Sequence, residues 1–363
     1  MNIEPLNREP PVKELVSSFI TTEGAYNRNH SVIPNINGAT HAVTIDGEVE
    51  LPLSLSISQL KHEFPQHEVV CALQCAGNRR HTMRTKLKEV HGVDWTDGAV
   101  MNCKWKGPLL RDVLMKAGLK ENRPEESSLH VAFACFQAPC QDDEYYGGSI
   151  ELWRAIRPDR EVILALEMND EPLLPEYGFP VRVVVPGVAG ARWVKWLDRI
   201  TVQPSESPNF YQQHDYKILP PEALTWEIAE KFWDTVPSIQ CMPVNSVVAT
   251  PNDDETIELS SDGFLNVQGY AVPHGDKGPV IRVEVSVDGG KTWADAEIRQ
   301  SRLQNKWCWV LWEAKVMASK GINKTIYSRA TDAGGNTQQE FSRWNLRGVA
   351  YNGYGASWNV TVV

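Results

Sequence analysis

Apolar residues recur with mixed periods in the first part of this 363-residue chain. Alternating or continuously apolar runs predict strands, and runs of helical spacing predict helices. The predicted strands cover residues 41–47, 67–73, 162–167 and 181–185. The predicted helices run from a cap at Ser58 to Phe64, from Leu109 to Ala117, and from just after Ser149. Helices interspersed with irregularly ordered strands favour an α+β domain over a doubly wound sheet.

Two segments show neither period. The first thirty residues contain Pro5, Pro10 and Pro11, and proline disrupts a helix interior, so an extended arm without early helix is predicted. Residues 204–237 combine Ser, Pro and Gln with isolated aromatic residues. This composition predicts a linker that wraps over the surface.

Beyond the linker the period is almost purely two, and strands are predicted at 256–259, 264–272, 281–287, 307–316 and 325–330. Asp288-Gly289-Gly290 is a hairpin turn signal between two of them. About seven short strands over about 125 residues are typical of a β-sandwich. Its tryptophans at 307, 309 and 312 are either core or interface residues, because alternate residues of a sandwich strand face inward. We therefore predict two domains, residues 1–230 and 231–363.

The charge balance narrows the possible partners. Lys and Arg number 36 against 46 Asp and Glu, a net charge of -10, which argues against nucleic-acid binding. No apolar run reaches the ~18 residues of a membrane span. The amino terminus has no apolar core for a secretory signal, and the carboxyl terminus is not Ser-Lys-Leu. We expect an intracellular soluble protein, in the cytoplasm by default, with the peroxisome and the mitochondrion left open.

Seven cysteines do not form a recognisable metal or disulfide framework. Cys71 and Cys75 are four residues apart and Cys135 and Cys140 five, so neither pair has the CxxC spacing of a zinc site. Most of them are expected to be small buried residues. The nucleotide fingerprints GxGxxG and GxxxxGK[ST] are also absent from the sequence.

Residues 73–80, with the sequence LQCAGNRR, carry the most chemistry. Cys75 follows a predicted buried strand, and the small residues beside it allow a ligand to approach the backbone. The two arginines that follow supply a positive field, which lowers the pKa of a thiol. The residue types leave three interpretations open: an activated nucleophile, a metal thiolate, or a buried cysteine beside a solvated arginine pair.

This octapeptide resembles the signature of the sulfite oxidase family, the molybdenum-cofactor enzymes that also include eukaryotic assimilatory nitrate reductase. Further motifs resemble that family in the same order along the chain. They are Asn27–His30, Trp95, Tyr146–Ile150, Gly178–Gly187, Gly190–Leu197, Asp288–Trp293 and Trp344–Gly348. The resemblance implies an α+β molybdopterin-binding domain followed by an all-β immunoglobulin-like sandwich that forms a homodimer.

The resemblance also implies a cofactor and an anion pocket. The Cys75 thiolate is expected to bind molybdenum held by molybdopterin, because soft sulfur suits a redox metal. No haem is expected, since no His-Pro-Gly-Gly element is present. Arg28, Arg80 and Arg347 are expected to bind the anionic substrate. Trp95 and Tyr146 would close this pocket, Tyr146 donating to an oxygen at the metal, and Arg79 is a weaker candidate.

The pterin phosphate needs donors of its own. Arg182 and Lys195 occupy the family's positions, with His30 and Arg192 as companions. Tyr177 stands where the family commonly has histidine, and a tyrosine donates one hydrogen bond but carries no positive charge. The phosphate contact expected at Tyr177 is therefore in question.

The resemblance favours sulfite as the substrate. Nitrate reductases carry methionine at the position of Arg347, and a third arginine suits the dianion sulfite better than the monoanion nitrate. The expected reaction is oxygen-atom transfer to sulfite, with the electrons passed to molecular oxygen or an external cytochrome. The alternatives are a nitrate reductase-type enzyme, a molybdenum subunit that reduces methionine sulfoxide, and a non-catalytic sandwich protein with a degenerate front domain.

Overall fold

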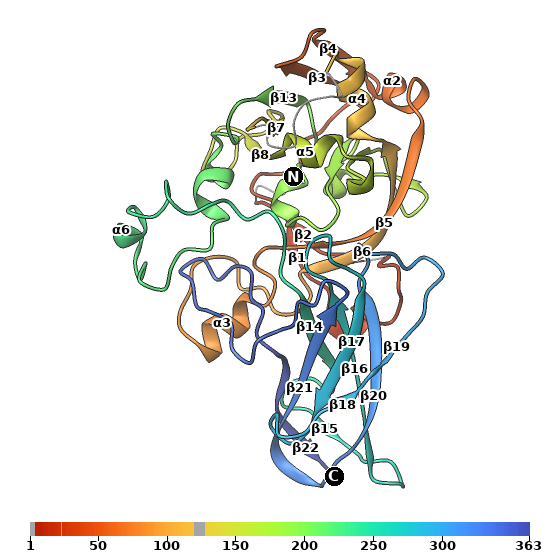
Figure 1. Ribbon diagram of the computed structural model, residues 1–363, viewed down its shortest axis with the longest axis vertical. Helices are drawn as coiled ribbons and strands as arrows, with labels where there is room; N and C mark the ends of the chain where they lie inside the picture. Colours follow the sequence, from red (N-terminus) through yellow and green to blue (C-terminus); the bar gives the residue numbers. More distant parts are fainter. Residues whose placement is uncertain (1–3, 23, 120–127) are drawn as a thin grey trace.

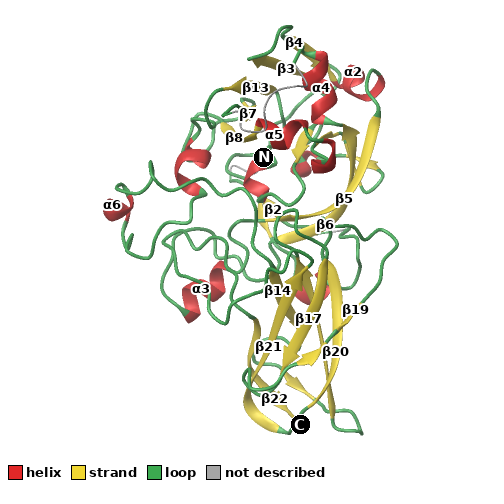
Figure 2. Cartoon of the chain, viewed as in Figure 1, coloured by secondary structure: helices red, strands yellow, loops and turns green. Residues whose placement is uncertain are grey.

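The computed structural model describes residues 4–22, 24–119 and 128–363, and none of the helices in these ranges has both the length and the apolarity to cross a membrane. Two bodies follow each other along the long axis of the molecule (Figure 1). The amino-terminal body mixes short helices with strands, whereas the carboxy-terminal body is built from strands and ends at the carboxyl terminus (Figure 2). The α+β region followed by a sandwich, as predicted, is confirmed.

The first body contains two main sheets and two small ones. One main sheet has the order β11-β10-β6-β5 and the other the order β4-β3-β13-β7-β8; β12 pairs with β9, and β1 with β2. The strands are β1 Asn7–Arg8, β2 Asn27–Arg28, β3 Ala42–Gly47, β4 Leu53–Ser56, β5 Gln66–Gln74, β6 Val100–Pro108, β7 His130–Cys135, β8 Tyr146–Glu151, β9 Ile163–Ala165, β10 Glu167–Met168, β11 Glu171–Pro172, β12 Arg182–Val184 and β13 Arg199–Gln203.

The helices of this body are short. They are α1 Val12–Leu15, α2 Ile57–His62, α3 Arg80–Lys86, α4 Leu110–Lys116 and α5 Leu152–Ile156, with single 3₁₀ turns at Pro158–Arg160, Pro175–Tyr177 and Gly190–Arg192. α4 confirms the predicted helix, and Gly118 follows it with φ +84°. The one-turn helix α1 contradicts the prediction of an arm without early helix. It begins directly after Pro11, where proline removes no helical hydrogen bond.

The cap of α2 is also not the predicted one. The cap residue is Ser56, not Ser58, because Ser56 and Gln59 form a reciprocal capping box. The Ser56 hydroxyl accepts from the Gln59 backbone N–H at 3.2 Å, and the Gln59 side chain accepts from the Ser56 backbone N–H at 3.1 Å. A cap at Ser58 would place Lys61 at the third helical position, and a lysine cannot accept that return bond.

The second body is a sandwich of two sheets, of orders β14-β16-β20-β19 and β15-β22-β21-β17-β18, with a core of buried Val, Leu, Ile, Ala and Trp. Its strands are β14 Asn245–Thr250, β15 Thr256–Ile257, β16 Phe264–Val272, β17 Val280–Ser286, β18 Ala294–Asp295, β19 Glu297–Ile298, β20 Val310–Met317, β21 Gly321–Asp332 and β22 Gly355–Val362. β14, β18, β19 and β22 were not predicted. The predicted turn at Asp288 joins β17 to β18, with Gly289 and Gly290 at positive φ.

The strand predicted from residue 307 begins only at Val310, because the preceding residues contact the first body. The Ala72 N–H of β5 donates to the carbonyl of Trp307 at 3.0 Å, and the Asn305 amide donates to the carbonyl of Val70 at 2.9 Å. The tryptophans at 307, 309 and 312 are all buried within the single chain. Of the two predicted alternatives, core or interface, these tryptophans are therefore core residues.

The predicted surface linker does more than connect the bodies. Residues 204–237 contain a π-helical turn at Tyr211–Asp215 and the short helix α6, Trp226–Ala229, which projects from the side of the molecule (Figure 1). Tyr211, Asp215 and Tyr216 are buried, so the interpretation as a surface wrap is wrong for this part. Its aromatic and charged side chains pack inward, next to the site described below.

Candidate functional site

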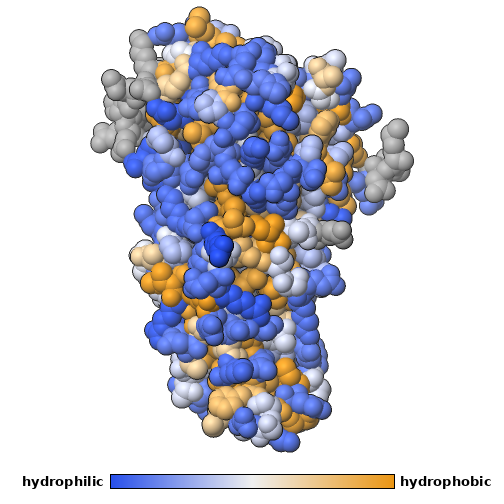
Figure 3. All heavy atoms as spheres, turned by 90° about the vertical axis from the view of Figure 1, so that its right-hand side faces the viewer, coloured by the Kyte–Doolittle hydropathy of each residue, from blue (hydrophilic) through white to orange (hydrophobic). Residues whose placement is uncertain are grey.

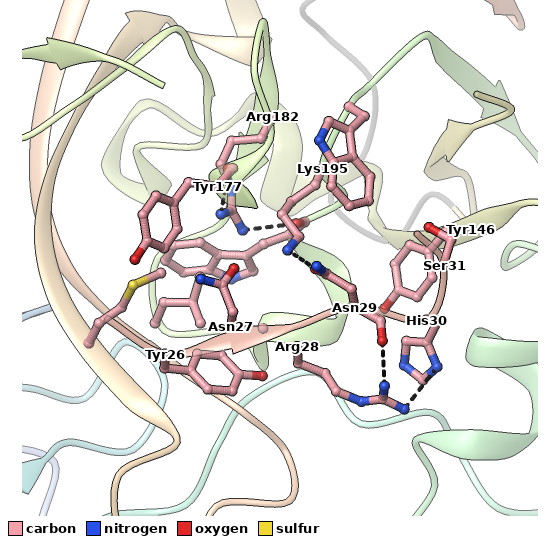
Figure 4. A pocket seen from close by; sticks show the side chains of 15 residues that line it. Tyr26, Asn27, Arg28, Asn29, His30, Ser31, Tyr146, Tyr177, Arg182 and Lys195 are labelled. Carbon is pink, nitrogen blue, oxygen red and sulfur yellow. Dashed lines mark hydrogen bonds between the residues drawn. The ribbon is translucent and has the colours of Figure 1, made fainter. Parts of the chain in front are cut away.

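A cavity with about 560 Å³ of empty space, part of it open to solvent, lies in the first body (Figure 4). Residues 26–31 of the arm form one wall, and β8, β12 and the segment around Lys195 contribute the others. Among the described residues that line it are three cations and no carboxylate. Six predicted site residues line it together: Arg28, His30, Tyr146, Tyr177, Arg182 and Lys195.

The two cations farthest from solvent have no acidic partner in the cavity. Arg182 donates to the carbonyls of Tyr177 at 3.0 Å and Trp193 at 3.1 Å, and burial lowers its pKa to about 10. Lys195 donates to the Asn29 side-chain oxygen and to the carbonyl of Glu176. Burial and the charge of Arg182 hold the pKa of Lys195 well below its usual range. Buried positive charges without a counter-charge favour the binding of an anion.

Three buried donors beside this cavity or behind its wall have no hydrogen-bond partner in the protein: Asn29 Nδ2, Arg182 Nε and Arg192 Nη2. Unpaired buried donors are rare in folded proteins and indicate an acceptor that binds there. Arg192 already donates to the carbonyls of Ile239 and Tyr211 and does not line the cavity itself. Asn29 and Arg182 do line it, so this donor set fits a phosphate-bearing cofactor.

Cys75 lies directly after β5, beside the tyrosine and arginines of the cavity. It is 4% exposed, and its sulfur accepts a hydrogen bond from the Gly77 N–H at 3.4 Å. Burial raises the pKa of Tyr26 well above its usual value, and so does a hydrogen bond to Cys75, which places the two side chains in contact. Burial raises the pKa of four other cysteines, Cys103, Cys135, Cys140 and Cys308, to about 12, which makes them inert thiols.

The Arg80 guanidinium packs directly against the backbone of Gly77 and Gly92. A side chain on Gly77 would lie 2.5 Å from the Arg80 guanidinium, and one on Gly92 would lie 2.7 Å from it. Arg80 donates to the carbonyls of Arg347 at 2.9 Å and Val93 at 2.7 Å, and burial and the charge of Arg347 lower its pKa. Gly77 is therefore required because the Arg80 side chain occupies the space of a Cβ atom there, and not only because a ligand could approach the backbone.

Arg347 comes from the second body and is held by the linker. It forms a buried ion pair with Asp215, and its guanidinium lies 5.1 Å from the ring centroid of Trp226. Neither Asp215 nor Trp226 was predicted as a site residue. The sequence signal for Asp215 is the concentration of aromatic and titratable residues at 210–216 in an otherwise Pro- and Ser-rich segment, and it does not include Trp226.

Tyr216 is a further candidate site residue that the sequence analysis missed. Its hydroxyl lies 2.8 Å from His30 Nε2, and His30 Nδ1 lies 3.0 Å from Arg28 Nη2. Because arginine only donates, Nδ1 accepts, and the ring proton is on Nε2 and is donated to Tyr216. Burial and the charges of Arg28 and Arg347 hold the pKa of His30 well below its usual value, so the ring stays neutral. The hydroxyl proton of Tyr216 is thus left free for a bound ligand.

The two remaining predicted pocket residues are buried next to this group. Tyr146 lines the cavity but donates to the carbonyl of Ala191 at 2.8 Å, and its ring stacks on His30 at 5.4 Å. Burial raises its pKa well above the usual value. Trp95 packs edge-on against Tyr26 at 5.5 Å, and its indole N–H has no partner in the protein. Tyr216 is therefore connected to Arg28 through His30, whereas the Tyr146 hydroxyl is bonded to the backbone carbonyl of Ala191.

The arm supplies a positive charge at Tyr177. The Tyr177 hydroxyl accepts from Arg8 at 3.2 Å and donates to the carbonyl of Ala25 at 3.3 Å. Arg8 Nε is a further buried donor without a partner. A guanidinium that the sequence analysis did not consider therefore stands next to the position where a histidine was expected.

Known proteins resemble this chain over nearly its whole length. Residues 30–211 match the oxidoreductase molybdopterin binding domain, and residues 236–362 match the Mo-co oxidoreductase dimerisation domain. Human mitochondrial sulfite oxidase is 43% identical over 96% of this chain, and the chain spans 63% of that protein's length. Arabidopsis thaliana sulfite oxidase is 38% identical over 95% of this chain and 89% of its own length.

Two further matches extend the comparison. A Volvox carteri nitrate reductase is also 38% identical, over 96% of this chain and 41% of its own length. The crystal structure of the sulfane dehydrogenase SoxCD from Paracoccus pantotrophus superposes with a TM-score of 0.76 at 25% identity, covering 98% of this chain and 88% of that one. The fold of this chain is therefore shared with a sulfane dehydrogenase, and its sequence is similar to enzymes named for sulfite and for nitrate.

Proposed function

This chain belongs to the sulfite oxidase family of molybdopterin-binding oxidoreductases, and we propose that it oxidises sulfite to sulfate. The observation that carries the proposal is a group of three arginines, of which two lie beside Cys75 and the third bonds to one of them. Arg28 comes from the arm, Arg80 from the first position of α3, and Arg347 from the second body. Cys75 is close enough to act electrostatically on the pKa of both Arg28 and Arg80, and Arg80 donates to the backbone carbonyl of Arg347.

The charge of this group matches a dianion. Arg28, Arg80 and Arg347, which we call the arginine group, stand beside one carboxylate, Asp215, and the neutral ring of His30. Three positive charges and one negative charge leave two net positive charges for the substrate. Planar guanidinium forks also fit the oxygens of an oxyanion better than ammonium groups do.

The molybdenum cofactor supplies, when bound, the two-electron oxygen-transfer chemistry. Arg182, Lys195 and Asn29 would hold its phosphate, with Arg192, His30 and the Arg8–Tyr177 pair behind them, and the Cys75 thiolate would bind the metal. Sulfite and water yield sulfate, two protons and two electrons. The arginine group would orient the anion, Trp95 would exclude water with Tyr26, and Tyr216 would hold a proton at its hydroxyl for an oxygen of the ligand. Tyr146 would position His30 by stacking.

Metal analysis and sulfite titration test the proposal. We expect about one molybdenum per chain and turnover of sulfite with ferricyanide or oxygen as electron acceptor. A Cys75→Ser protein should lose turnover while remaining folded. Full activity of that variant would overturn the thiolate assignment, and nitrate turnover without sulfite turnover would overturn the substrate.

The other proposed properties do not rest on the geometry of the site. We propose oxygen or an external cytochrome as the electron acceptor, no haem bound by this chain, a cytoplasmic location, and a domain division at residues 230 and 231. The dimerisation-domain match at residues 236–362 supports a homodimer. One face of the molecule carries apolar atoms across its middle, as an association surface would (Figure 3).

A further inference from the structure

We propose that Arg79 is a positioning residue for the substrate pocket: it fixes the second body against the loop that carries Cys75 and Arg80, and thereby sets the place of Arg347. The inference rests on the proposed function for the identity of the substrate. It concerns a residue of the cysteine motif that does not line the cavity.

Arg79 and Arg80 point in different directions although they are neighbours. Arg79 has φ +67° and ψ +25°, a left-handed conformation that is uncommon for a residue other than glycine. This backbone turn sends Arg80 towards Cys75 and sends Arg79 into the second body. The preceding Asn78 faces the same way as Arg79, because its amide donates to the Tyr270 hydroxyl at 3.0 Å.

Both terminal nitrogens of the Arg79 guanidinium donate hydrogen bonds across the junction. It is 1% exposed and donates to Asn245 Oδ1 at 2.9 Å, to the Gly353 carbonyl at 2.8 Å and to the Tyr354 carbonyl at 2.6 Å. The guanidinium carbon lies 4.5 Å from the ring centroid of Tyr351. On the side of the first body, Asp97 lies 3.3 Å from its Nε. A rigid planar fork is held by five groups from two bodies.

Three of these groups, Tyr351, Gly353 and Tyr354, lie on the same segment as Arg347. This Arg347 segment, residues 345–354, is tied to the cysteine loop at three points: the Ala350 N–H donates to the Ala76 carbonyl at 2.7 Å, Arg80 donates to the Arg347 carbonyl, and Arg79 holds Gly353 and Tyr354. Tyr351 also packs with Met83 of α3. Loosening the contact at Gly353 therefore lets the segment shift, and Arg347 shifts with it.

The second body thus contributes more than an association surface. Arg79 donates to Gly353, which lies 274 residues further along the chain, and so joins the loop that carries Cys75 to the segment that carries Arg347. A displacement of about 1 Å at a binding group can cost a large factor in rate or affinity. For this reason a residue without ligand contact is expected to change ligand affinity.

The test compares Arg79→Met and Arg79→Lys with Arg160→Met. Arg160 serves as the control, because it is a partly buried arginine that also joins the two bodies, through its ion pair with Asp276, and no hydrogen bond or ion pair connects it to a site residue. The measurements are the thermal midpoint, the sulfate dissociation constant by calorimetry, and KM and kcat for sulfite with ferricyanide.

We expect Arg79→Met to weaken sulfate binding and raise KM by about tenfold with kcat changed less than about threefold. Arg79→Lys should lie between it and the wild type, since the charge is kept but the fork is lost. Arg160→Met should lower the thermal midpoint and leave sulfate affinity unchanged. Unchanged sulfate affinity in a folded Arg79→Met protein would overturn the inference, and so would an equal loss in Arg160→Met.

A milder variant keeps the test decisive if Arg79→Met does not fold. Asn245→Ala removes one acceptor of Arg79, and it should weaken sulfate binding by a smaller factor; no change in a folded Asn245→Ala or Arg79→Lys protein contradicts the inference. Sulfate binding also separates the two proposals. A wild-type protein that binds sulfate but does not oxidise sulfite contradicts the proposed function, while the calorimetric comparison still decides the role of Arg79.

Discussion

The cofactor cavity and the arginine group share Arg28, and their other cations differ in how their donors are satisfied. In the cavity, Asn29 Nδ2 and Arg182 Nε have no partner in the protein, and no carboxylate is present among the described lining residues. In the arginine group, Arg347 is paired with Asp215 and Arg80 with two carbonyls. Unsatisfied buried donors call for a resident ligand, whereas donors with partners tolerate a site that empties at each turnover.

The comparison predicts its largest effect in the cavity. Lys195→Met removes a buried cation that no other protein group replaces, so cofactor retention should be lost and molybdenum per chain should fall by more than about tenfold. Metal analysis of the purified protein measures it. The control is Lys106→Met, a lysine on the far side of β6 that pairs with Glu167 at 3.4 Å, and its metal content should be unchanged. Normal molybdenum content in Lys195→Met would contradict the claim that the cations of the cavity hold the cofactor.

A change in the arginine group should act on the substrate and not on the cofactor. Arg347→Met removes one guanidinium and leaves the Asp215 carboxylate unpaired, so sulfite should bind about ten- to a hundredfold more weakly at unchanged molybdenum content. Steady-state kinetics with ferricyanide measure KM. A loss of molybdenum in this variant would show that the two sets are not independent.

Asp215→Asn should strengthen anion binding in the arginine group, whereas Arg347→Met weakens it. The substitution keeps the size of the side chain and removes the charge that competes with the substrate for Arg347. We expect KM for sulfite and the dissociation constant for sulfate to fall by about threefold, and kcat to fall with slower sulfate release. A rise in both constants would mean that Asp215 positions Arg347 more than it competes with the ligand.

The smallest effect concerns His30, which stands between the two sets. Its pKa is lowered by burial and by Arg28, so the unfolded chain binds a proton that the folded chain does not. This contribution to stability is fully present above the unfolded value of about 6.5 and is lost as pH falls below it. Thermal midpoints between pH 7.5 and pH 5 should therefore fall less in His30→Gln than in the wild type. An equal fall in both proteins would exclude His30 as a cause.

Much of the local structure could be predicted from the sequence. The alternation in residues 264–272 predicted β16 with the same bounds, and the spacing from Leu109 to Ala117 predicted α4. The short motifs also predicted which side chains meet in the cavity, among them Arg28, Arg182 and Lys195. These predictions succeed because a period or a motif is a local property, set by backbone geometry and by the chemistry of a few adjacent residues.

Other features could not be predicted because they depend on long-range contacts. Trp307 starts no strand, since its carbonyl accepts from Ala72, more than two hundred residues earlier along the chain. Tyr216 lies in a segment whose composition is that of a linker, and only the fold brings its hydroxyl to His30. Asp215 likewise meets Arg347 across 132 residues.

The sequence by itself determined many of the elements, the family and most of the residue types of the site. Only the tertiary structure decided that Arg79 faces away from Arg80, that Arg8 stands beside Tyr177, and that His30 is neutral. The physical reason is that charge state and direction depend on burial and on partners distant in the chain. A motif fixes which groups are available, and the packed chain fixes what each of them touches.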